Sequence, residues 1–89
     1  MDESEQEFFL HTKPAKMMVR LADPSAENYA SALSSRIDCT YSHAVRIIQK
    51  LEEMGLVESN KKGRKKYIEL TSRGEDVAHT LNDLMKLLD

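Results

Sequence analysis

The sequence predicts a single α+β domain that is mainly helical, and three observations lead to this expectation. Residues 40–57 form one segment whose apolar positions repeat with the period of an α-helix. After Gly55 the period changes to that of a β-strand, which alternates between two faces. A last amphipathic stretch begins after Thr71. We therefore expect helices in the first half, then a hairpin, then a closing helix.

Length and composition indicate one small soluble domain. The 89 residues leave room for a single modest core, and 40% hydrophobic and 31% charged residues are ordinary for a globular protein. No apolar run approaches the roughly 20 residues of a membrane span, and the acidic start lacks the order of a signal peptide. We expect a cytoplasmic protein with no membrane partner. A single cysteine, Cys39, excludes an intrachain disulfide.

The net charge of −2 hides a segregation of charge along the chain. Residues 1–35 carry three basic and six acidic side chains, residues 36–66 eight basic and four acidic, and residues 67–89 two basic and five acidic. A basic middle between acidic ends is expected of a domain that presents one face to phosphates.

The chain begins with an acidic segment, residues 1–11, that is too polar to pack except at the apolar cluster Phe8-Phe9-Leu10. Thr12-Lys13-Pro14 then predicts a helix start, because threonine can cap a helix and proline is tolerated in the first turn. Asp23-Pro24 ends this first helix. Its apolar side consists of Met17, Met18, Leu21 and Ala22.

A second short helix is expected after a brief extended piece at residues 28–30, with Ser31 as its N-cap. Leu33, Ser34 and Ile37 would face inward. Asp38-Cys39-Thr40 then forms a tight turn into the next helix. Two short helices at this spacing, the second with a polar outer face, form a helix-turn-helix.

The helix that follows has clear boundaries, since Thr40 can accept hydrogen bonds from the first free amides and Gly55 can adopt a left-handed backbone at the end. One face carries the apolar stripe Ala44, Ile47, Ile48 and Leu51. The opposite face is polar, and we interpret this element as a recognition helix. Its polar face consists of Tyr41, Ser42, His43, Arg46, Gln49 and Lys50.

Two strands are expected at residues 56–59 and 66–70, joined by a loop over residues 60–65. The connection places five positive charges within the six residues 61–66, with Gly63 allowing a tight turn. A merely soluble hairpin would not need this density of charge. The sequence therefore predicts a hairpin with a basic tip.

Two motifs in register resemble those of winged helix-turn-helix domains, most closely of MarR-type and related small archaeal regulators. The family's junction from recognition helix to wing is resembled by residues 51–57, which read Leu-Glu-Glu-Met-Gly-Leu-Val. The start of the family's helix after the wing is resembled by residues 70–74, which read Leu-Thr-Ser-Arg-Gly. The resemblance covers roughly residues 12–85 and departs from the family at Ser34, usually alanine, and Asp38, often glycine. Serine is small and aspartate tolerates an unusual turn backbone, so we expect the fold to persist.

The resemblance implies a winged helix-turn-helix over residues 12–71, with a three-helix core and a two- or three-stranded wing, followed by a C-terminal helix over residues 72–89. MarR-type proteins usually have longer flanking helices that build a ligand pocket, and this chain lacks that length. The resemblance therefore does not imply a ligand-binding regulator.

The expected function is sequence-specific binding of duplex DNA by a transcription regulator. Arg46 is the best candidate for a bidentate contact to guanine, His43 or Tyr41 could touch phosphates, and the wing cations would lie on the backbone or reach the minor groove. The expected DNA-binding residues are Thr40, Tyr41, Ser42, His43, Arg46, Lys50, Lys61, Lys62, Arg64, Lys65 and Lys66.

The closing helix has two readings. Its apolar residues could pack back onto the first helix, or they could form a seam with a second copy, and the width of the apolar surface favours a homodimer. Phe8 and Phe9 could join the same interface or the monomer core. The expected interface residues are Val77, Leu81, Leu84, Met85 and Leu88.

Other functions find less support in the residues. Cys39 and His43 are too few for a metal site, no nucleophile, base and acid can be placed together, and no glycine loop cradles a phosphate. We expect a non-enzyme with no cofactor, no metal and no small-molecule substrate. The main alternative is a winged-helix protein-interaction module in a larger assembly. Binding to single strands or RNA is less favoured, because exposed aromatic residues are few.

Overall fold

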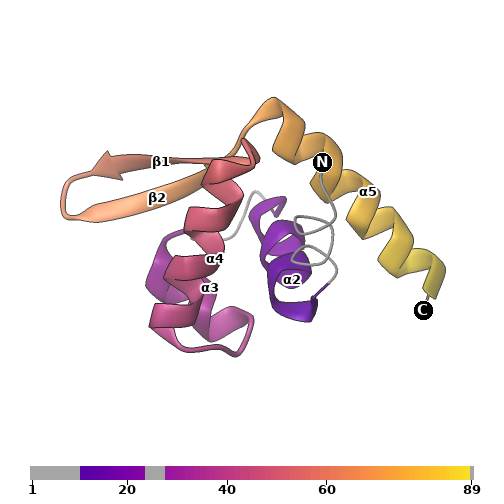
Figure 1. Ribbon diagram of the computed structural model, residues 1–89, viewed down its shortest axis with the longest axis horizontal. Coiled ribbons are helices and arrows are strands. Elements are labelled where there is room, and N and C mark those ends of the chain that lie inside the picture. The colour runs from indigo at the N-terminus through magenta and orange to yellow at the C-terminus, as the bar shows by residue number, and fades with distance from the viewer. Residues whose placement is uncertain (1–10, 24–27, 89) are drawn as a thin grey trace.

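The computed structural model describes residues 11–23 and 28–88, and within them one antiparallel hairpin projects from a group of helices that lie at its base (Figure 1). The mainly helical α+β class is confirmed. The predictions made for residues 1–10, including Phe8 and Phe9, lie outside the described residues. In chain order the elements are α2 (Thr12–Leu21), α3 (Ala30–Arg36), α4 (Tyr41–Glu53), β1 (Val57–Lys62), β2 (Lys65–Leu70) and α5 (Ser72–Leu88).

Helix α2 begins at Thr12, as the sequence predicts, but its N-cap is His11, which makes no side-chain capping hydrogen bond. Pro14 is buried in the first turn, where its missing N–H costs nothing. Met17 and Met18 are fully buried and Leu21 nearly so, which makes this helix one wall of the core.

Helix α3 starts two residues earlier than expected, and the prediction of Ser31 as its N-cap is wrong. The N-cap is Tyr29, which is held in extended backbone because it forms a β-bridge with Tyr67 of β2. The helix can therefore begin directly at Ala30. The extended piece expected at residues 28–30 is confirmed at Tyr29, which adds a short third strand-like contact to the wing, but Ala30 already belongs to the helix. The predicted inward residues Leu33, Ser34 and Ile37 are all buried.

The turn between α3 and α4 is shaped by Asp38, whose φ of 55° places it in the left-handed region that aspartate tolerates. Lys13, from α2, donates hydrogen bonds to the carbonyls of Ile37 and Asp38 and so ties the first helix to this turn. The Thr40 hydroxyl oxygen accepts a hydrogen bond from the amide of His43 at 3.1 Å. The predicted cap of α4 is confirmed.

The apolar stripe of α4 faces the core as predicted. Gly55 ends the region with a φ of 74°, so the expected left-handed stop is also confirmed. The four stripe residues Ala44, Ile47, Ile48 and Leu51 are at most 5% exposed.

The hairpin is longer than the sequence suggested, and the expected six-residue loop is wrong. Strand pairing runs from Val57 opposite Leu70 to Lys62 opposite Lys65, which leaves only Gly63 and Arg64 in the turn. Gly63 has a φ of 66°, as a two-residue type II′ turn requires at its first position. Charge does not prevent pairing here, because both strands expose these side chains to solvent.

Helix α5 is attached to the base of the hairpin by Thr71. Its hydroxyl donates to the carbonyl of Gly55 at 2.7 Å and accepts from the amide of Gly74 at 3.1 Å, which confirms the predicted cap. The first half of α5 packs against α2, with Ala78 buried and Val77 and Leu81 half-buried against the core. The interpretation that α5 packs back onto the first helix is therefore correct for the first half of α5.

The hairpin and the end of α5 project toward opposite sides of the molecule, with α2, α3 and α4 between them (Figure 1). Among residues 11–23 and 28–88, no helix is both long and apolar enough to cross a membrane.

Candidate nucleic-acid interface

The outer face of α4 is open to solvent at its N-terminal end. Tyr41 is 58% exposed, and Ser42, His43 and Arg46 are exposed beside it. Thr40 is exposed as well, but its hydroxyl oxygen is used to cap the helix. Lys50 lies near the other end, half-buried, with its ammonium 3.8 Å from the carboxylate of Glu53. Arg46 is therefore the cation of this face best placed to meet a ligand.

Every side chain of the wing tip, which is residues 61–66, is exposed. The register sets Lys61 directly opposite Lys66, and Lys62 directly opposite Lys65. Like charges at opposite positions of a hairpin repel each other. Among the described residues of the wing, the one ion pair joins the Lys62 ammonium to the Glu69 carboxylate at 4.0 Å; both side chains are exposed, so the pair neutralises little charge. The tip thus keeps most of its positive charge.

One face of the wing carries a cluster of two tyrosines and two lysines. The rings of Tyr29 and Tyr67 meet edge to face, with centroids 5.9 Å apart and planes at 86°. The ammonium of Lys65 lies 4.3 Å from the centroid of Tyr29, and that of Lys62 lies 5.7 Å from the centroid of Tyr67. Both are cation–π distances. These rings hold two of the wing cations in defined places.

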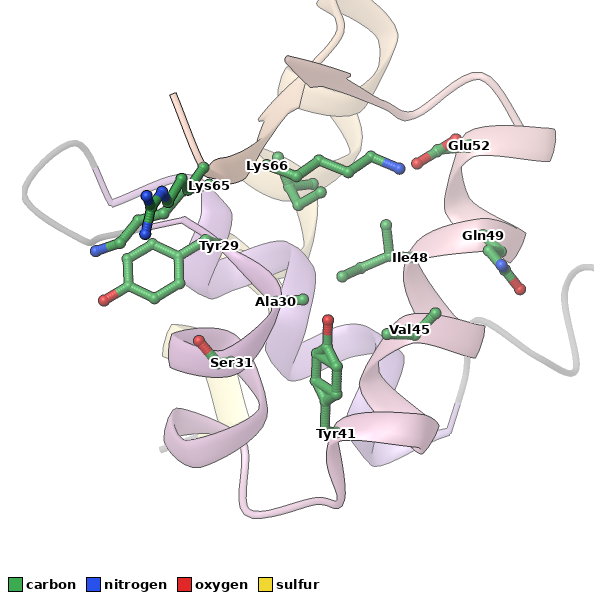
Figure 2. A pocket seen from close by; sticks show the side chains of 12 residues that line it. Tyr29, Ala30, Ser31, Tyr41, Val45, Ile48, Gln49, Glu52, Lys65 and Lys66 are labelled. Atoms are coloured by element: carbon green, nitrogen blue, oxygen red, sulfur yellow. The ribbon is translucent and has the colours of Figure 1, made fainter. Parts of the chain in front are cut away.

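A groove of about 340 Å³ separates the wing from α4, and we call it the helix–wing groove. Figure 2 shows Tyr41 rising from α4 and Tyr29 standing at the other side, with Lys65 and Lys66 above them. Aliphatic side chains form its floor, and basic side chains of the wing form its rim. The floor consists of Ala30, Val45, Ile48 and Ile68, and the rim of Arg64, Lys65 and Lys66.

The groove contains one carboxylate, that of Glu52. Glu52 Oε1 accepts a hydrogen bond of 2.6 Å from the hydroxyl of Ser59, so one of its oxygens is engaged within the protein. Lys66 extends over the groove toward Glu52 (Figure 2).

The structure brings some of the predicted DNA-binding residues to one groove and leaves others around it. Tyr41 of α4 and Arg64, Lys65 and Lys66 of the wing line the helix–wing groove, whereas Arg46, His43 and Ser42 lie on the exposed face of α4 outside it. Tyr29 also lines the groove, and sequence reasoning missed it. Its partners on β2 are far along the chain, so the only signal was the expectation of an extended backbone at this position.

Cys39 is half-buried in the turn that precedes α4. Burial raises the pKa of its thiol, the Lys13 ammonium opposes this rise, and the Asp38 carboxylate adds to it. The thiol is therefore mostly protonated at neutral pH, which makes it a poor nucleophile. Within residues 11–23 and 28–88, no three histidine, cysteine or acidic side chains lie together as a metal site would require.

The second half of α5 carries apolar side chains in solvent, away from the wing (Figure 1). Leu84 is 47% exposed and Leu88 is 76% exposed. Met85 and Leu87 are exposed beside them. The predicted interface residues therefore divide into Val77 and Leu81, which contact the core, and Leu84, Met85 and Leu88, which lie open.

Comparisons with known proteins agree with this architecture. Residues 43–82 match the family described as the DUF6293 C-terminal winged helix domain. An uncharacterized protein of Archaeoglobus fulgidus is 30% identical over 61 residues, which are 68% of this chain and 64% of that protein, just under two thirds of its length.

Solved structures resemble the chain over nearly its whole length. A possible HxlR family transcriptional factor from Thermoplasma volcanium matches with a TM-score of 0.84 at 22% identity, covering 99% of this chain and 83% of that one. MepR of Staphylococcus aureus, in its complex with DNA, matches with a TM-score of 0.75 at 14% identity, covering 93% and 70%.

A third structure is the homodimeric winged helix-turn-helix DNA-binding domain of Mb0332 from Mycobacterium bovis, a possible ArsR-family regulator. It matches with a TM-score of 0.71 at 22% identity, covering 96% of this chain and 75% of that one. At these identities the likeness establishes the fold. The chain is a winged helix-turn-helix domain, and its structural neighbours include a MarR family transcriptional regulator from Silicibacter pomeroyi beside the possible HxlR and ArsR family regulators. The resemblance to MarR-type winged helices is confirmed.

Proposed function

We propose that the chain is a transcription regulator that binds duplex DNA, with α4 in the major groove and the wing on the sugar–phosphate backbone. The observation that carries this proposal is the wing tip, where like charges face each other across the hairpin beside the exposed polar face of α4. Such an arrangement stabilises neither strand by itself, and bound phosphates would relieve the repulsion. That MepR, a neighbour of the same fold, is known in a complex with DNA supports the proposal.

In this proposal Arg46 reads base edges, since it is exposed on α4 and arginine is suited to bidentate contacts with guanine. Ser42 and His43 extend the same face, and Tyr41, Lys50 and Thr40 border it. Lys61, Lys62, Arg64, Lys65 and Lys66 neutralise phosphates, which contributes affinity without sequence preference.

The test is fluorescence anisotropy of a random-sequence duplex at several salt concentrations. We expect the affinity of the native chain for duplex to fall steeply with salt concentration. A Lys61→Ala/Lys66→Ala variant should bind more weakly, and its slope of log affinity against log salt should be smaller by about 0.9 for each phosphate contact removed. A Lys16→Ala/Arg73→Ala variant is the matched control, because it also removes two exposed charges but none from the wing. Equal binding by the two variants would contradict the role of the wing.

If the native chain fails to bind duplex even at low salt, the DNA-binding proposal fails as a whole. The fold would then be better interpreted as a protein-interaction module.

We also infer that the chain forms a homodimer through the second half of α5. Leu84 and Leu88 are one helical turn apart and both face solvent, which is costly in a monomer but normal in an interface. The homodimeric state of the Mb0332 domain supports this inference. A dimer would present two α4 helices to the two half-sites of a pseudo-palindrome.

Sedimentation equilibrium tests the dimer. A Leu84→Glu/Leu88→Glu variant should sediment as a monomer, whereas Lys86→Glu, an exposed polar position on the same turn, should leave the mass unchanged. A native chain that sediments as a monomer at concentrations of about 100 μM would contradict the inference.

A further inference from the structure

The helix–wing groove differs from the rest of the surface, because it joins apolar, aromatic and cationic side chains in one place. Its floor is aliphatic, Tyr29 and Tyr41 stand at its sides, and the rim cations come from the wing tip (Figure 2). The groove lies between the two elements of the proposed DNA-binding surface, the wing and α4.

These features restrict the chemistry of the occupant. The cationic rim favours an anion, since neither Lys65 nor Lys66 makes an ion pair in the described part of the chain, and the Glu52 carboxylate of the groove is engaged by the Ser59 hydroxyl. The aliphatic floor and the tyrosine rings require a carbon surface. A free inorganic anion would satisfy only the rim, and an apolar peptide only the floor. A sugar–phosphate strand offers both, because charged phosphates alternate with the carbons of deoxyribose.

The position of the groove agrees with this chemistry. In the DNA-binding mode proposed above, α4 enters the major groove and the wing lies on the backbone beside the minor groove. One sugar–phosphate strand separates those two grooves of the duplex, so it must cross the space between α4 and the wing. We propose that this strand lies in the helix–wing groove, and that Tyr29, which the sequence did not place in the DNA-binding site, belongs to it beside the already expected Tyr41.

The two tyrosines contribute in different ways. In Figure 2 the hydroxyl of Tyr41 points into the groove, where it can donate a hydrogen bond to a phosphate. Tyr29 acts as a positioning residue, since its ring lies 4.3 Å from the ammonium of Lys65 and its backbone is bridged to β2. Its edge-to-face contact with Tyr67 fixes the ring in turn. Lys65 is thereby placed at the rim before any phosphate arrives.

This inference rests on the proposed DNA binding, and the same anisotropy titration of the full chain tests it with four single variants and one double variant. Tyr41→Phe keeps the ring and removes the hydroxyl, so it should weaken duplex binding by about fivefold at every salt concentration without changing the salt slope. Lys65→Ala should reduce the slope of log affinity against log salt concentration by about 0.9, which corresponds to one lost phosphate contact.

The contribution of Tyr29 is isolated by a double-mutant cycle with Lys65. Tyr29→Leu should weaken binding by about threefold, because the ring under the ammonium is lost, while Tyr29→Phe should bind as the native chain does. In the Lys65→Ala background, Tyr29→Leu should have no further effect. A merely structural role would lower affinity equally in both backgrounds, and that result would overturn the positioning role.

Three further outcomes separate a failure of the groove proposal from a failure of DNA binding itself. If the native chain binds duplex but Tyr41→Phe and Tyr29→Leu bind just as well, the groove is not the seat of the strand, while the proposed function stands. If the native chain binds no duplex, both fail together. If a single-stranded oligonucleotide of the same length competes as strongly as duplex, the groove takes an unpaired strand, and the duplex geometry argued here is overturned.

Discussion

The β1–β2 hairpin is packed at its base and charged at its tip. At the base, Leu56, Val57 and Ile68 are at most 3% exposed, and α5 lies so close that Gly74 meets the backbone of Leu56. At the tip, all six residues from Lys61 to Lys66 face solvent, and lysine lies opposite lysine twice. Within a few residues, the same two strands therefore change from buried apolar packing to exposed like charges.

The contrast between base and tip indicates which part of the hairpin serves the fold and which part serves binding. The base obeys the rules of a stable fold, with buried apolar residues and satisfied hydrogen bonds. The tip breaks one of those rules, since lysine faces lysine across the hairpin, and the contacts of Lys62 and Lys65 with tyrosine rings offset this repulsion only in part. Local rules are typically broken at functional sites. Substitutions at the base should therefore change the free energy of unfolding, and substitutions at the tip should change binding.

The largest effect is expected at the base, for Gly74→Ala. A Cβ at this position would lie 1.9 Å from the carbonyl oxygen of Leu56, which is backbone and cannot move without displacing the start of β1. We expect a loss of about 3 kcal/mol or more in the free energy of unfolding, measured by urea denaturation.

Arg73→Ala, at the neighbouring exposed position, is the control and should change stability by less than about 0.5 kcal/mol. If Gly74→Ala unfolded at the same urea concentration as the control, the close approach of α5 to the base would be wrong.

A smaller effect is expected for Thr71→Val at the same base. The substitution keeps the shape of the side chain but removes the hydroxyl that bonds Gly55 and Gly74, so we expect a loss of about 1–2 kcal/mol. Thr80→Val is the matched control, because the Thr80 hydroxyl bonds only the Asp76 carbonyl within its own exposed helix turn. Thermal unfolding that shifts equally for both variants would show that Thr71 does not join α5 to the base.

The sequence predicted those parts of the molecule whose conformation depends on near neighbours. Thr40 caps α4 through the amide three residues on, Gly55 adopts a positive φ at the helix end, and Asp38 does so in the turn. Each signal needs only the residues around it. The motifs that resemble winged helices then placed these elements in the right order.

The errors came from strand pairing, which residue preferences at single positions do not show. The lysines of the tip have no strong preference for a strand, so residues 60–65 resembled a loop, but pairing from the packed base extends through them to the Gly63-Arg64 turn. Ser31 looked like a cap because serine is a good one, yet the bridge between Tyr29 and Tyr67 decides where α3 begins. The same bridge places Tyr29 in the candidate site, which no local pattern could reveal.

The smallest expected effect is at the tip, and its sign is opposite to that at the base. Lys61→Glu replaces a like-charge pair with an opposite-charge pair, because Lys66 lies directly across the hairpin. We expect the free energy of unfolding to rise by about 0.5 kcal/mol at low salt, and this gain to fade as salt screens the pair. The measurement is urea denaturation at low and high salt.

Duplex affinity of the same variant should fall, since a phosphate contact is replaced by a carboxylate that repels the backbone. Lys16→Glu makes the same change of charge on α2, at an exposed position away from the hairpin, and should leave duplex affinity nearly unchanged. A Lys61→Glu variant that is both less stable and equally tight in binding would remove the distinction between base and tip. A variant that is more stable and binds more weakly would mean that the repulsion at the tip is retained because phosphates relieve it.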